Sequence, residues 1–221
     1  MRAYPASVER AGALATNRVL RNTYLLLSMT LLFSAGTAML AMVTGARPMG
    51  AMLATFGAIA LVWFVLPRVE NSAAGLGVVF AFAGLMGYGL GPTLAFHLAL
   101  PGGPQLVATA LGGTGAVFLG LSAYAAMSRR DFSFMGGFLF VGLIVVLLAS
   151  IANLFLAIPA VSLAISAAVV LLMSGLILFD TSRIVNGGET NYVRATVALY
   201  LDIYNLFVHL LHLLAVLRGE D

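Results

Sequence analysis

The chain of 221 residues is too apolar to fold as a soluble domain. Hydrophobic residues make up 62% of it and charged residues only 9%, whereas soluble domains carry about 25% charged residues. Its mean hydropathy is +1.06. Because a membrane-spanning helix needs about 20 residues, the length allows roughly six to eight spans and excludes a separate soluble domain. The absence of cysteine also excludes disulfides and thiolate metal sites.

Seven apolar runs are long enough to cross a bilayer, and each should be an α-helix because a strand exposed to lipid leaves backbone groups unpaired. We predict an all-α polytopic membrane protein with an N-terminal tail at residues 1–23, a seven-helix domain at 24–217 and a C-terminal tail at 218–221. The break at Pro159 is the weakest, so the fifth and sixth runs could divide elsewhere. The expected spans are 24–44, 49–67, 73–99, 105–127, 134–157, 160–180 and 193–217.

The arginines predict the orientation. All eleven basic residues are arginine, and basic residues are retained on the cytoplasmic side of a membrane. With the N-terminus in the cytoplasm, nine arginines fall on that side, leaving only Arg47 and Arg218 outside. Residues 1–23 are too polar for a cleaved signal peptide, and we expect a retained cytoplasmic tail. A seventh complete span places the C-terminus outside, whereas a re-entrant last helix would return it. Since the position of the arginines is explained by membrane topology, the net positive charge does not indicate an anionic partner, and we expect no nucleic-acid partner.

The third and fourth runs are rich in glycine, which lets helix backbones approach closely in a bilayer. We therefore predict tight helix packing at these residues. The alternative for the third run is a flexible or kinked helix around Gly89-Leu90-Gly91-Pro92, because proline removes one helix hydrogen bond.

Polar groups at membrane depth are costly, so they are the first candidates for a functional site. Asp180 ends the sixth apolar run, and Asp202 lies well inside the seventh. One face of the last helix should carry the four polar residues with 3-4-3 spacing, which are Asp202, Asn205, His209 and His212. We predict that this face turns inward and that Asp202 either shares a proton with Asp180 or binds a cation together with it.

Simpler interpretations stay open for each of these residues. Asp180 could reach the membrane interface from its helix end, and a protonated Asp202 could only join helices. We expect His209 and His212 to be interfacial or packing residues, because no second pair with metal-ligand spacing is visible.

The chain offers no catalytic constellation. No lysine of a phosphate-binding loop, HExxH or GxSxG motif is present, and the settings Phe179-Asp180 and Leu201-Asp202 do not match those of intramembrane aspartyl proteases. We therefore predict a protein that is not an enzyme and that has no cofactor, with a bound cation as the one candidate ligand.

Several passages resemble a known family. The stretch GGETNYVRATVALYLDIYNLF at residues 187–207 resembles the C-terminal signature of the Bax inhibitor-1 (transmembrane BAX inhibitor motif) family. The resemblance spans nearly the whole chain. Further similar passages are VLRNTY at 19–24, GYGLGP at 87–92, ALGGT at 110–114, MSRRDFSF at 127–134 and LAIS at 163–166.

The resemblance implies a bundle in which six helices surround the C-terminal one, in a bacterial inner membrane. Bacterial members are known as substrates and modulators of the membrane-anchored FtsH protease, which implies this protease as a partner. Others are described as pH-sensitive calcium leak proteins, in which two aspartates matching Asp180 and Asp202 respond to protons. Those members set a basic residue of the second helix against the aspartates, whereas residues 49–66 contain none here.

Overall fold

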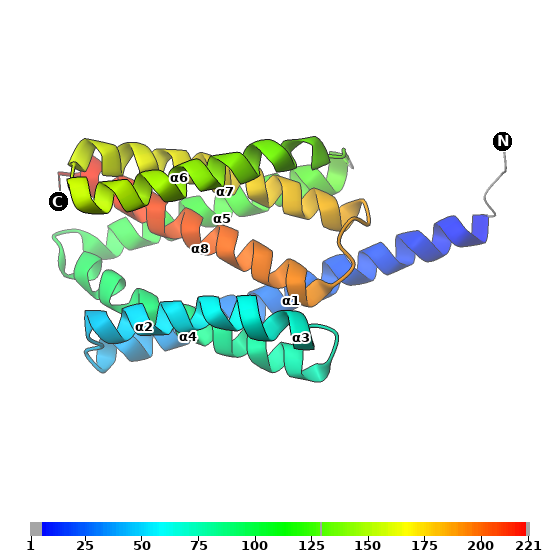
Figure 1. Cartoon of the computed structure of the whole chain (residues 1–221), viewed down its shortest axis with the longest axis horizontal. Coiled ribbons are helices and arrows are strands. Elements are labelled where there is room, and N and C mark those ends of the chain that lie inside the picture. The colour runs from blue at the N-terminus through cyan, green and yellow to red at the C-terminus, as the bar shows by residue number, and fades with distance from the viewer. Residues whose placement is uncertain (1–5, 129, 220–221) are drawn as a thin grey trace. The chain divides into compact units, whose positions relative to one another are not determined.

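The computed structural model describes the backbone of residues 6–128 and 130–219, and side chains within these ranges from Thr16 onward. Every regular element in the described ranges is a helix, so the all-α prediction is confirmed (Figure 1). The elements are α1 (Ala6–Val43), α2 (Pro48–Ala60), a π-helix (Leu61–Val65), α3 (Leu66–Val69), α4 (Ala73–Ala99), α5 (Gly103–Ser128), a 3₁₀ turn (Ser133–Met135), α6 (Gly136–Leu156), α7 (Pro159–Val185) and α8 (Tyr192–Leu217).

Seven of the helical stretches in the described part of the chain are long and apolar enough to cross a membrane, as predicted. The last stretch, Tyr192–Leu217, has the largest buried share, at 44%, against 33% or less for the others. This agrees with the prediction that the C-terminal helix is the enclosed one. The N-terminal region at 1–23 is helical from Ala6 onward, and residues 1–5 and 220–221 of the predicted tails lie outside the described residues.

The boundary between α6 and α7 lies just before Pro159, at a sharp turn of the chain. Ala157 adopts a left-handed conformation with φ of 51° and ends α6. The side chain of Asn153 then accepts a hydrogen bond from the backbone N of Ile158, at 3.1 Å. Pro159 opens α7, where its missing N–H costs nothing because the first helical N–H groups have no partner within the helix.

The second span contains a widened turn that the sequence analysis did not anticipate. The π-helix at Leu61–Val65 directly precedes Pro67. A proline ring clashes with the carbonyl four residues earlier, and a π-helical turn relieves that crowding by adding a residue. The guanidinium of Arg68 also donates to the carbonyl of Phe64.

The chain forms two compact units. Unit 1 holds the described residues up to Thr93 together with Arg183–Tyr200, and unit 2 holds Leu94–Ser182 with the described residues from Leu201 onward. Helices α4, α7 and α8 therefore contribute residues to both.

Unit 1 is organised around a buried tyrosine. Tyr200 of α8 is 1% exposed. Its hydroxyl oxygen lies 2.6 Å from Ser34 Oγ of α1 and 3.4 Å from the carbonyl oxygen of Ala83 in α4. Its ring also packs edge-on against Phe82, with 5.1 Å between ring centroids. A buried tyrosine needs a partner for its hydroxyl, and this arrangement joins three helices at one point.

The glycines of α4 pack closely against neighbouring helices of unit 1. The helix continues past Pro92. A Cβ atom added at Gly87 would overlap the backbone oxygen of Ser34, one at Gly89 would meet Thr55, and one at Gly91 would meet Ala41. Of the two expectations for this run, close packing is therefore the one that the structure favours. In Figure 1, α1, α2 and α4 run side by side.

Unit 2 has an apolar core between α6, α7 and α8. Two glycines allow this contact, because a Cβ at Gly175 would lie 2.7 Å from Leu139 and one at Gly142 would lie 2.6 Å from Leu172. The buried members of this core are Leu139, Val169, Leu172, Met173, Ile177 and Leu206.

The close approach at Gly87 predicts a strong effect of one methyl group. Gly87→Ala should lower the free energy of unfolding by about 1–3 kcal/mol, because the added carbon overlaps α1. The matched control is Gly77→Ala in the same helix, where a Cβ meets nothing within 4 Å. The control should keep or raise stability by up to about 1 kcal/mol. Thermal unfolding in detergent measures both, and equal stability of the two variants would contradict this packing.

Candidate functional site

The two acidic residues of the predicted site lie together in unit 2, Asp180 on α7 and Asp202 on α8. Asp202 is 5% exposed, and the carboxyl group of Asp180 lies close enough to interact with it. Two ionised carboxylates repel each other and only accept hydrogen bonds, so this close approach favours a proton on one of the two. The Oδ2 atom of Asp202 is buried with no hydrogen-bond partner among the described residues. The pair thus has an acceptor position that can receive a further donor or a cation.

The end of α7 that carries Asp180 is fixed by the next two residues. Thr181 Oγ1 lies 3.3 Å from Ser122 Oγ of α5. The hydroxyl of Ser182 accepts a hydrogen bond from the backbone N of Phe132, at 3.1 Å, and donates to the carbonyl of Arg130, at 3.0 Å. Asp180 therefore stands on a helical turn that is joined both to α5 and to the loop before α6.

That loop carries an acidic group outside the spans, Asp131. The backbone N of Ser133 donates to Asp131 Oδ1 at 2.8 Å. Hydrogen bonds from the side chain and backbone of Ser133 hold the pKa of Asp131 below its usual value, and Asp131 is exposed. It therefore stays an ordinary surface carboxylate, unlike the buried Asp202.

The other residues of the predicted polar face contact α7 or their own helix. His209 Nδ1 lies 3.1 Å from Ser166 Oγ, and His212 Nε2 lies 3.3 Å from Ser162 Oγ. The amide of Asn205 donates to the carbonyl of Leu201 one turn earlier, at 2.8 Å. The two histidines thus each meet a serine of α7.

The serines were not identified as site residues from the sequence. Ser162 and Ser166 are four residues apart, so they share one face of a helix. That spacing was the available signal. It is weak, because serines in membrane helices commonly bond to the carbonyl four residues back, as Ser174 does to Val170 at 2.7 Å.

Two pockets adjoin this face within unit 2. One has a volume of about 220 Å³ and is lined by Asn205, His209 and Ser150 together with apolar residues of α6 and α7. The other has a volume of about 280 Å³ and lies where α7 begins and α8 ends, beside Ser162 and His212. The polar face is therefore bordered by space at two levels.

The site offers few ligands for a tightly held metal ion. Within the described ranges, no group of three or more His, Asp or Glu side chains is arranged to hold a metal. Calcium takes about six to eight oxygen ligands, of which the two carboxyl groups supply up to four. The arrangement is therefore suited to exchanging protons, and to a cation that keeps part of its water.

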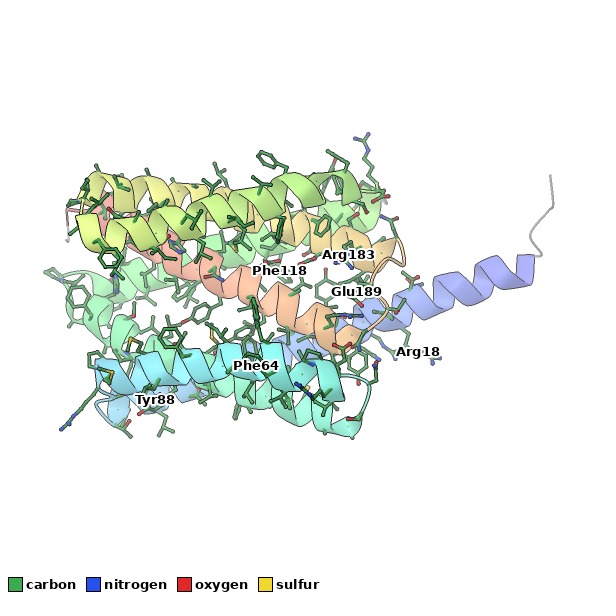
Figure 2. The ribbon with its side chains drawn as sticks, viewed as in Figure 1. Arg18, Phe64, Tyr88, Phe118, Arg183 and Glu189 are labelled. Atoms are coloured by element: carbon green, nitrogen blue, oxygen red, sulfur yellow. The ribbon has the colours of Figure 1, made fainter. Side chains whose placement is uncertain are left out.

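A second polar cluster lies within unit 1, and the sequence analysis did not predict it. Glu189 is 8% exposed and accepts a hydrogen bond from Arg194 Nε at 3.0 Å. Arg194 also lies 3.4 Å from Glu70, and Arg183 lies 3.9 Å from Glu189. Figure 2 shows Arg183 and Glu189 beside the connection between α7 and α8. The cluster joins this connection to Glu70, at the end of α3.

Asn191 completes that cluster. Its Oδ1 accepts a hydrogen bond from the backbone N of Val193 at 2.9 Å, which satisfies one of the free N–H groups at the start of α8. Its amide nitrogen donates to the carbonyl of Glu70 and to Asn71 Oδ1, at 3.3 and 3.0 Å. The start of α8 is therefore fixed to the turn between α3 and α4.

Comparison with known proteins gives consistent matches over nearly the whole chain. The sequence matches the family described as Inhibitor of apoptosis-promoting Bax1 over residues 16–219. An uncharacterized membrane protein of Vibrio cholerae is 52% identical over 216 residues, covering 98% of this chain and 96% of the relative. An uncharacterized protein of Pseudomonas aeruginosa is 43% identical, covering 92% and 91%.

A relative with a functional name is found in Escherichia coli. "Modulator of FtsH protease YccA" is 48% identical over 209 residues, covering 95% of this chain and 94% of the relative. The same identity and coverage are found for "Inner membrane protein YccA" of another strain. With the seven apolar helices, these matches establish that the chain is a multi-pass membrane protein belonging to the Bax inhibitor-1 family.

Proposed function

We propose that this protein modulates a membrane-anchored AAA+ protease of the FtsH type in the bacterial inner membrane and is itself a substrate of that protease. The observation that carries the proposal is the 48% identity, over 95% of this chain, to a protein named as a modulator of FtsH protease. A substrate that is slow to be extracted occupies the protease, and in this way it can act as a modulator.

The contacts of α1 explain how extraction could be slow. The first 23 residues are polar and contain four arginines, a segment that a cytoplasmic AAA+ ring could grip. Pulling on it would load α1, whose residue Ser34 is bonded to Tyr200 of α8 at 2.6 Å. The buried hydroxyl of Thr196, which donates to the carbonyl of Tyr192 in its own helix at 2.7 Å, also lies 3.3 Å from the carbonyl oxygen of Thr23. Breaking these contacts exposes polar groups to lipid, which costs about 1–3 kcal/mol for each unsatisfied group.

A proton-linked cation leak is the second candidate, and one contact favours it. The close approach of Asp180 and Asp202 places two carboxyl groups, and one buried Asp202 oxygen without a hydrogen-bond partner, at membrane depth. Loss of the shared proton would leave two negative charges in a medium that tolerates them poorly, and a cation would then bind in its place. The leak would therefore respond to pH.

In this candidate, no basic residue within positions 49–66 of the second span is available to pair with the two aspartates. The one basic residue between Pro48 and Val69 is Arg68, at the end of the span, and it donates to Phe64 of its own helix. We therefore propose that the shared proton, rather than a basic residue of the second span, reduces the charge of the carboxylate pair from two negative charges to one.

The degradation proposal predicts a requirement for the N-terminal segment. Deleting residues 2–15 should stop degradation by FtsH in purified components, because no segment of sufficient length is left to grip. The matched control, with Arg2 and Arg10 changed to Gln, keeps the length and should still be degraded. Turnover of the deletion variant at the rate of the full chain would refute the proposal.

The leak candidate predicts a pH dependence that needs Asp202. Calcium flux into proteoliposomes should be higher at about pH 8 than at about pH 6, since protons compete with the cation for the carboxyl pair. Asp202→Asn keeps the shape of the side chain and should abolish that dependence. Asp131→Asn, in the exposed loop, should behave as the wild type. Equal flux in wild type and Asp202→Asn at both pH values would remove the pair from the mechanism.

The orientation proposed here, with the N-terminus in the cytoplasm and the C-terminus in the periplasm, is testable because the chain has no cysteine. A single cysteine at the exposed Pro101, between α4 and α5, should react with a membrane-impermeant maleimide in intact cells once the outer membrane is made permeable. A cysteine at the exposed Thr190, between α7 and α8, should react only after the inner membrane is disrupted. The reverse pattern would invert the topology.

A further inference from the structure

The polar face of α8 continues from the carboxyl pair toward the end of the helix. Asn205, His209 and His212 follow Asp202 at intervals of three or four residues. At a rise of 1.5 Å per residue, neighbouring groups are separated by about 4.5–6 Å along the axis. One water molecule can bridge two polar groups at such a separation. The face therefore has the spacing of a hydrogen-bonded chain.

Helix α7 supplies a second row of groups only at one end. Ser162 and Ser166 contact the two histidines at 3.3 and 3.1 Å. Between Ser166 and Asp180, the buried residues of α7 that belong to the unit 2 core are apolar, and they are Val169, Leu172, Met173 and Ile177. A chain of hydrogen-bonding side chains along α7 would therefore be interrupted at these apolar residues.

The pocket of about 220 Å³ lies at that interruption. It is lined by Val169, Leu172 and Met173 on α7 and by Asn205 and His209 on α8. A water molecule occupies about 30 Å³, so the volume is sufficient for several. Ser150 of α6 also lines the pocket, and with Asn205 and His209 it provides the polar partners that a water molecule in a pocket needs.

We propose that the serine–histidine pairs of α7 and α8, together with water in this pocket, form a proton route between the Asp180–Asp202 pair and the end of unit 2 where α7 begins. The inference rests on the second candidate function, in which the pair binds protons. In each step a ring nitrogen, hydroxyl or water accepts one proton and releases another, so no net charge is left on the route, and rotation of these groups then restores it for the next proton. A histidine can do this because its two ring nitrogens exchange roles.

The titratable groups around His209 suit such a route. On α8 these are Asp202, Tyr204 and His212, whereas the span of α6 contains none and α5 contains only Tyr124. On the unit 2 part of α7 the one such group is Asp180, and His97 and Arg218 belong to the ends of α4 and α8. The carboxyl pair is therefore the one acidic destination for a proton that leaves His209 along these helices.

Infrared spectroscopy of the full chain in lipid tests the route directly. The protonated carboxyl band of the pair is identified by its change in Asp202→Asn, and its shift in heavy water gives the rate of proton exchange at the pair. His209→Phe and Ser166→Ala should slow this exchange at least about tenfold. The matched controls are His97→Phe and Ser174→Ala, whose side chains lie outside the route, and both should exchange at the wild-type rate.

Each outcome separates the route from the function on which it rests. Absence of a protonated carboxyl band across the accessible pH range would overturn both the leak candidate and the route. A normal band with wild-type exchange in His209→Phe and Ser166→Ala would overturn the route and leave the pair as a proton site. Equal slowing in the controls would also overturn it, because the cause would then be general loosening of the protein.

Discussion

The bilayer offers no water to hydrogen-bonding groups, and most of this structure follows from that one constraint. Backbone groups at membrane depth must pair within the protein, which favours helices. The same requirement governs side chains. Many hydroxyls bond to a carbonyl of their own helix, as Ser28 does to Tyr24, Thr44 to Leu40 and Ser150 to Val146. Only the remaining polar groups are available to join different helices, and these few contacts carry the specific chemistry of the protein.

Helix α8 takes part in most of these contacts in both units. In unit 1, Tyr200 bonds to Ser34 of α1 and lies 3.4 Å from the carbonyl oxygen of Ala83 in α4. In unit 2, His209 and His212 meet serines of α7, and Asp202 meets Asp180. This accounts for its large buried share, since a helix with so many polar groups cannot face lipid. The stability of the bundle and its candidate proton chemistry therefore depend on the same helix.

The sequence was sufficient for the number and type of spans, because hydropathy and length constrain them strongly. It also suggested the carboxyl pair, since an aspartate at membrane depth needs a partner and Asp180 was the available one. It could not identify Ser162 and Ser166, because a serine that joins two helices and one such as Ser174, which bonds to its own, look alike in a sequence. The cluster around Glu189 depends on the meeting of two distant turns, and the π-helix depends on how Pro67 is accommodated. Neither leaves a periodic pattern.

The tight reversal at Ala157 bears on the order in which the protein can be made. Only Ala157 and Ile158 separate α6 from α7, so these helices emerge from the ribosome as one hairpin, and Gly142 and Gly175 let them pack at once. Helices α7 and α8 do not become available together, however, because α8 is synthesised after α7. Until it arrives, Ser166 and Asp180 have no partner from that helix. Membrane insertion must therefore pass through a stage in which the face of α7 that later meets α8 is not yet covered by that helix.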